Sequence, residues 1–125
     1  MTATDFLEAK LLDHALGNGA YTPPSSLYLC LHFTDPTESG TIGQVTGGTY
    51  APQLITFGPQ VASKSTSSNG QTFAGMPTVT ITHFSIRENS PTGNPMFVGT
   101  LANSRNLTAG DGISFGVGQI AITAD

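Results

Sequence analysis

The feature that most constrains the fold is the strict alternation of side chains along residues 26–33. Every second residue there is a large apolar one: Leu27, Leu29, Leu31 and Phe33. Because successive side chains of a strand point to opposite faces, the pattern predicts a β-strand with these side chains in the core. Asp35-Pro36 predicts where the strand gives way to a loop.

Shorter apolar segments, separated by turn residues, follow along the rest of the chain. They predict further strands at about residues 50–57, 78–87, 96–101, 113–117 and 120–122. Pro52 indicates that the first of these begins at a sheet edge or bulge. The turn-forming residues 90–95 predict an antiparallel hairpin between the second and the third.

The apolar phase changes inside the segment 78–87. Val79 and Ile81 occupy odd positions, whereas Phe84 and Ile86 occupy even ones. One inserted residue reverses the face that every later side chain meets, so the change predicts a β-bulge near Thr82 or His83.

One helix is predicted, at about residues 5–16. Asp5 followed by Glu8 has the spacing of a capping box. Gly17-Asn18-Gly19 predicts the end of the helix, because Gly and Asn tolerate the left-handed conformation. Apolar side chains recur at helical spacing: Leu7, Leu11, Leu12, Ala15 and Leu16.

These elements predict a mainly β fold, an antiparallel β-sandwich or partly closed barrel with one N-terminal α-helix. The length of 125 residues allows one hydrophobic core, so we expect a single β-rich domain over residues 1–125, with strands from about 26 to 124. Residues 37–48 are predicted to form an exposed loop, with Ile42 and Val45 as its candidate anchors.

The charge distribution argues against several partners. Only 10% of residues are charged, the net charge is -4, and the four cations lie apart: Lys10, Lys64, Arg87 and Arg105. This predicts no direct nucleic-acid binding, because no basic stripe faces a phosphate backbone. The sequence contains neither a signal peptide pattern nor about 20 consecutive apolar residues, which predicts synthesis in a cytoplasm and no membrane span.

The side chains that could perform chemistry are few. His32, His83 and Asp35 are candidate metal ligands, since imidazole and carboxylate suit zinc, but no close His-x-His or His-x3-His spacing supports them. His14 is expected to be solvated on the helix. Asp35 and Glu38 are paired acids in a loop, where carboxylates commonly make turn hydrogen bonds.

Cys30 is the chain's only cysteine and is expected to be buried and inert in its apolar strand. An alternative is a nucleophile activated by His32 on the same strand face. Neither glycine group, 110–112 nor 116–118, has the context of a nucleotide site. Tyr21, Tyr28 and Tyr50 leave carbohydrate binding open, although no Trp is present. The prediction is therefore a protein without catalytic, cofactor or metal site.

Several segments resemble small virion proteins of tailed phages. They include Phe6-Leu7-Glu8-Ala9-Lys10, Tyr21-Thr22-Pro23-Pro24, Val45-Thr46-Gly47-Gly48-Thr49-Tyr50, Phe97-Val98-Gly99-Thr100-Leu101 and Leu107-Thr108-Ala109-Gly110-Asp111. Such proteins are usually labelled tail fibre or minor tail proteins. The resemblance implies a non-enzymatic structural protein of a virion, made in the cytoplasm of the bacterial host, with phage structural proteins as partners.

Two positions in the particle fit this resemblance. A fibre must be long, and this chain has no coiled coil or repeat to make it so, which favours a capsid decoration (cement) protein that contacts the major capsid protein. The alternative is a tail fibre or baseplate accessory protein in host adsorption, with tail proteins as partners. In either position we expect a homo-oligomer, with a trimer as one possibility, formed through the helix or residues 37–48.

Overall fold

The structure is a computed structural model that describes residues 2–124, and it is mainly β, as predicted. Its elements are α1 (Asp5–Ala15) and the strands β1 (Thr2–Ala3), β2 (Leu27–His32), β3 (Gln53–Ile55), β4 (Lys64–Thr66), β5 (Gln71–Phe73), β6 (Val79–Glu88), β7 (Pro95–Leu107), β8 (Ile113–Phe115) and β9 (Ala121–Thr123).

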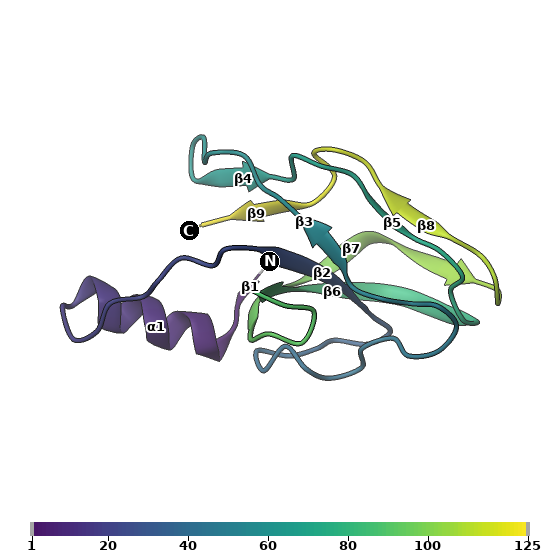
Figure 1. Ribbon diagram of the computed structural model, residues 1–125, viewed down its shortest axis with the longest axis horizontal. Helices are drawn as coiled ribbons and strands as arrows, with labels where there is room; N and C mark the ends of the chain where they lie inside the picture. Colours follow the sequence, from purple (N-terminus) through teal and green to yellow (C-terminus); the bar gives the residue numbers. More distant parts are fainter. Residues whose placement is uncertain (1, 125) are drawn as a thin grey trace.

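The strands form one large antiparallel sheet and a second, broken layer. The large sheet has the order β1-β7-β6-β2-β3, and the pairs β4-β9 and β5-β8 form the other layer (Figure 1). Within residues 2–124 no sheet closes on itself, so the fold is sandwich-like and not a closed barrel. β3 is an edge strand, as Pro52 predicted.

The hydrophobic core lies between these two layers. Leu29, Ile81 and Ile86 of the large sheet pack in one cluster with Phe73 of β5 and Phe115 of β8. The rings of Phe73 and Phe115 meet edge to face, with their centroids 6.3 Å apart. Val45 joins this core, as predicted for the loop, whereas Ile42 is 49% exposed and anchors nothing.

Strand β2 agrees with the alternation except at its end. Leu29 and Leu31 are completely buried, but Phe33 is 51% exposed, so its assignment to the core was wrong. The reason is that β2 ends at His32, and the backbone N–H of Phe33 donates to the carbonyl of Gly43 at 3.0 Å. The chain therefore turns before Phe33 can reach the core.

The predicted bulge lies where the phase change placed it. Ile81 pairs with Arg105 and His83 with Thr100, so Thr82 of β6 faces residues 101–104 of β7. The additional residues thus belong to β7, not to β6. Ile81 and Phe84 consequently point into the same core although their positions differ in parity.

Helix α1 begins at Asp5, as predicted, but its N-cap residue is one position earlier than the sequence indicated. Thr4, not Asp5, is the N-cap, and its hydroxyl accepts a hydrogen bond from the N–H of Leu7 at 3.3 Å. At the other end Gly17 adopts a positive φ of 78°, and the N–H of Asn18 donates to the carbonyl of Asp13 at 2.9 Å. This arrangement is a Schellman motif, as the sequence suggested.

Most of the apolar face of α1 lies outside the core. Leu7 is the buried residue of the helix, whereas Leu11, Leu12 and Leu16 are 47%, 61% and 66% exposed. Figure 1 shows the helix at one end of the molecule, running away from the sheets. In the part of the chain that the structure describes, no helix has the length and hydropathy of a membrane span.

Candidate functional site

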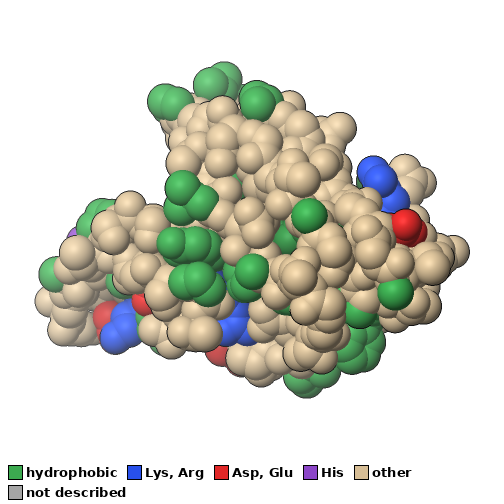
Figure 2. Space-filling view, turned by 45° about the vertical axis from the view of Figure 1, so that its right-hand side comes forward, with side chains coloured by type: hydrophobic (Ala, Val, Ile, Leu, Met, Phe, Trp, Pro, Cys, Tyr) green, Lys and Arg blue, Asp and Glu red, His purple; other side chains and the backbone are tan. Residues whose placement is uncertain are grey.

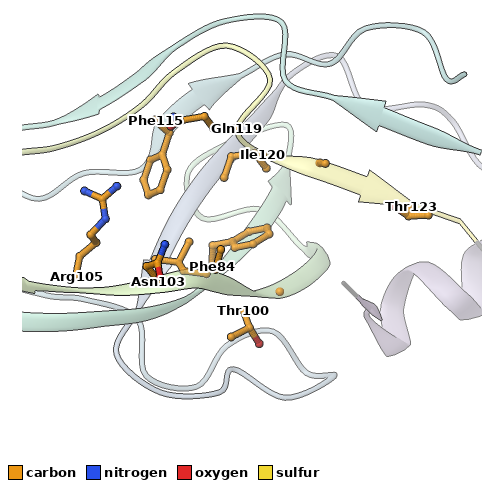
Figure 3. A pocket seen from close by; sticks show the side chains of 12 residues that line it. Phe84, Thr100, Asn103, Arg105, Phe115, Gln119, Ile120 and Thr123 are labelled. Atoms are coloured by element: carbon orange, nitrogen blue, oxygen red, sulfur yellow. The ribbon is translucent and has the colours of Figure 1, made fainter.

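A cleft of about 560 Å³ opens between the large sheet and the C-terminal part of the second layer. Its walls are β7 on one side and the β8–β9 segment on the other, with Phe84 of β6 between them (Figure 3). This volume falls within the range of about 300–1,000 Å³ that is typical of small-molecule sites. The cleft is therefore the candidate functional site.

The bulge in β7 shapes one wall of this cleft. Leu101, Ala102 and Asn103 lie in the bulge, and all contribute to the lining. A bulge bends its strand and changes the direction of its side chains, and bulges are common next to functional sites for this reason. Figure 3 shows Asn103 and Arg105 rising from β7 toward Phe115 on the opposite wall.

The floor of the cleft is apolar. Phe84, Phe115 and Ile120 are 6%, 7% and 3% exposed, so they belong to the core and present only their edges to the opening. Phe84 lies against Gly99, its partner on β7. Because the core holds these side chains, the floor is preformed.

The rim is polar and has unused hydrogen-bond donors. Among residues 2–124, no side-chain hydrogen bond or ion pair engages Arg105 or Asn103, and both are exposed. The Oε1 atom of Gln119 accepts from the N–H of Gly116 at 2.8 Å, which leaves its Nε2 donor toward the cleft free. Thr123 adds a hydroxyl group, whereas the side chain of Thr100 points to the other face of the sheet (Figure 3).

The candidate metal ligands His32, His83 and Asp35 are engaged in other contacts. His32 and His83 do face one another across β2 and β6. However, His32 already bonds the Ile42 carbonyl through Nδ1 and the Ser85 hydroxyl through Nε2, both at 2.8 Å. Asp35 accepts from the N–H of Thr37 at 2.9 Å, a turn hydrogen bond. Burial lowers the pKa of His32, so its neutral form is favoured.

Cys30 is fully buried, as expected. Its strand neighbour His32 bonds Ser85 instead. Burial raises the pKa of the Cys30 thiol, while the nearby Arg87 guanidinium acts in the opposite direction. Because the thiolate is the reactive form, this environment disfavours nucleophilic chemistry.

Arg87 forms a buried polar cluster behind the sheet that the sequence did not reveal. Arg87 is 9% exposed. Its guanidinium donates to the carbonyl of Gly93 at 3.2 Å and to Gln44 at 3.4 Å, and its Nε has no partner among the described residues. Tyr50 lies close by and accepts from the N–H of Leu31 at 3.0 Å. These contacts tie residues 44–50 to the sheet.

The sequence pairs Glu38 with Asp35, but in the structure Glu38 lies beside two other acidic residues. Its carboxylate groups with those of Asp5 and Glu8, with ligand atoms within 4.8 Å of one another. Repulsion by Glu8 is the main cause that raises the pKa of Glu38. All three side chains are exposed, and exposed acidic groups commonly cluster without an ion.

Neither the histidines nor the acids thus belong to the cleft, and sequence reasoning missed its polar residues. Asn103, Arg105 and Gln119 carry no motif, and only the fold brings them together. The phase change near Thr82 was the single sequence signal, since it marked the position of the bulge.

A small, sandwich-like β domain with a preformed cleft defines a binding or structural module. The sequence matches the family described as Podophage GP4 fiber I protein gp80 over residues 2–123. The chain belongs to this phage fibre family, and it is therefore a structural protein of a phage particle, as its resemblance implied. No curated protein matches the chain.

Proposed function

We propose that this protein is a non-enzymatic tail fibre or baseplate accessory component that takes part in host adsorption. The observation that carries the proposal is the match to a fibre family over residues 2–123. This match favours the fibre hypothesis and gives no support to capsid decoration, which the sequence had favoured because the chain lacks a coiled coil or repeat. Tail proteins, and not the major capsid protein, are then the expected partners.

The chain lacks fibre-forming repeats, and this is explained if it is one subunit of a larger fibre assembly. A compact domain of this length has a radius of gyration of only about 14 Å, so a long fibre must combine it with other chains. We expect residues 1–125 to act as a single domain, which the continuous core supports; Met1 and Asp125 lie outside the described residues.

Self-association through α1 is part of the proposal. Leu11, Leu12 and Leu16 are exposed on α1, and this helix lies at one end of the molecule (Figure 1). A second copy is a suitable occupant, because Lys10 and Asp13 on the same helix can pair with their counterparts across an antiparallel contact. The face drawn in Figure 2 carries few charged side chains, and hydrophobic side chains are exposed at several places on it.

The position of the protein in the particle tests the proposal. Gold-labelled antibodies against the protein are expected to bind at the tail in electron micrographs. Particles depleted of the protein should lose adsorption to cells and keep their resistance to heat. Labels distributed over the capsid shell, together with heat-sensitive depleted particles, would restore the cement hypothesis instead.

A further inference from the structure

The cleft between β7 and the β8–β9 segment has a marked excess of donors. Arg105 is the only charged residue among the residues that line it, and no carboxylate of the described chain faces it. The free donors are the guanidinium of Arg105 and the amide groups of Asn103 and Gln119. A ligand that pairs with these donors carries acceptors, and the guanidinium favours negative charge on it.

The positive charge is notable because the chain as a whole is acidic, with a net charge of -4. Arg105 is exposed, and within residues 2–124 no acid neutralises it. A planar guanidinium binds carboxylate or phosphate through two parallel hydrogen bonds. The cleft therefore offers an anionic group one exposed guanidinium on a chain that is acidic as a whole.

The remaining lining indicates what carries the anionic group. An apolar floor of Phe84, Phe115 and Ile120 lies beneath a rim that carries the two amides and the hydroxyl of Thr123. A pyranose ring matches this division, since its C–H face is apolar and its edge carries hydroxyl groups that bind amides. Sites with an apolar floor and a few placed polar groups are the usual form of small-ligand sites.

An extended peptide is the other ligand to consider, because β1 pairs only with Phe97 and Val98 and leaves the rest of the β7 edge open. Strand addition needs a regular row of backbone groups on such an edge. The bulge at residues 101–104 interrupts that row along the cleft. The geometry therefore favours a ligand bound by side chains.

We infer that this cleft binds a short acidic saccharide, with Arg105 on its anionic group and Asn103 and Gln119 on its hydroxyls. The inference deepens the proposed function and rests on it for the source of the saccharide, which would be the surface of the host cell. The anionic group is a carboxylate or a phosphate, because a guanidinium recognises both.

Titration of the ¹⁵N-labelled full chain, followed by amide chemical shifts, tests the inference. The probes are digalacturonic acid, its neutral match galactobiose, galactose 6-phosphate and a short acidic peptide. With an acidic sugar we expect chemical-shift changes at Asn103, Arg105 and Gln119. Galactobiose should bind at least about tenfold more weakly than the acidic sugar. The acid that binds tighter identifies the anionic group.

Two variants separate the cleft from general charge effects. Arg105→Gln should lose about tenfold in affinity for the acidic sugar and keep its melting temperature, because the side chain is exposed. Lys64→Gln removes an exposed cation from β4 that does not line the cleft but lies opposite Thr123, and it should leave binding unchanged if Arg105 alone holds the anionic group. If Arg105→Gln fails to fold, Asn103→Ala provides a second test, because it should also lose affinity for the acidic sugar.

The inference is overturned if no saccharide shifts the cleft residues, if galactobiose binds as tightly as the acids, or if only the peptide binds. Its failure is distinct from that of the proposed function. Gold labels at the tail with no saccharide binding refute the cleft assignment alone. Labels over the shell with saccharide binding intact refute the fibre position alone.

Discussion

The ring of Phe84 lies directly against Gly99, its cross-strand partner on β7. A Cβ atom at position 99 would stand 2.6 Å from the Cζ atom of Phe84, a distance that real Cβ contacts do not show. The glycine is thus required by the aromatic ring and not by its own backbone conformation. The pair sets the floor of the cleft.

Replacing Gly99 with alanine should therefore destabilise the protein. Phe84 is only 6% exposed and cannot move aside freely, so we expect a loss of about 1–3 kcal/mol in the free energy of unfolding, measured in urea. Gly58→Ala is the matched control, because the nearest atom to its added Cβ is 4.0 Å away. Equal effects of the two substitutions would contradict this account.

Leu29→Ala and Phe33→Ala should separate the two ends of the alternating segment. Leu29 is completely buried, and its truncation should cost roughly 2–5 kcal/mol. Phe33 is 51% exposed, so its truncation should cost much less. The measurement is the denaturation midpoint of each variant. A large loss of stability in Phe33→Ala would contradict this account, because it would show that the Phe33 side chain is buried in the isolated protein.

This segment also shows how far the sequence could lead. Alternation predicted the strand and the core positions of Leu29 and Leu31, because these follow from local geometry. It could not predict that the strand ends at His32, or that the side chain of His32 on the other face is buried. Both depend on residues 42–45, whose contacts with β2 are long-range.

The cleft was beyond sequence reasoning for the same reason. Its lining joins β6, β7 and the β8–β9 segment, and the side chains of Asn103, Arg105 and Gln119 are ordinary surface types. The helix pattern was misleading in one respect. It predicted an apolar face correctly, but Leu7 is the one residue of that face that is buried against the rest of the protein.

Stability should fall in mild acid because of His32. Burial lowers its pKa below the usual value of 6.5, so the unfolded chain takes up a proton that the folded chain does not. The contribution is fully present above pH 6.5 and is lost as the pH falls through that value toward the folded pKa. Urea denaturation at pH 7.5 and pH 5.5 measures it. His32→Gln should reduce this pH dependence, whereas an unchanged slope would assign the effect to other groups.

The exposed face of α1 leads to the last prediction, which concerns association. Leu12 is 61% exposed, so Leu12→Glu should leave the free energy of unfolding of the isolated fold within about 0.5 kcal/mol. Placed in a contact between two helices, the same carboxylate would be buried without a partner, which is strongly unfavourable. Sedimentation velocity over a range of concentrations should therefore find oligomers of the native chain and monomers of the variant. Val117→Glu is the matched control, since Val117 is 69% exposed in the β8–β9 segment and lies away from the helix. If the native chain stays monomeric at every concentration, or if both variants dissociate it equally, α1 is not the contact between copies, and its leucines must meet another protein of the particle.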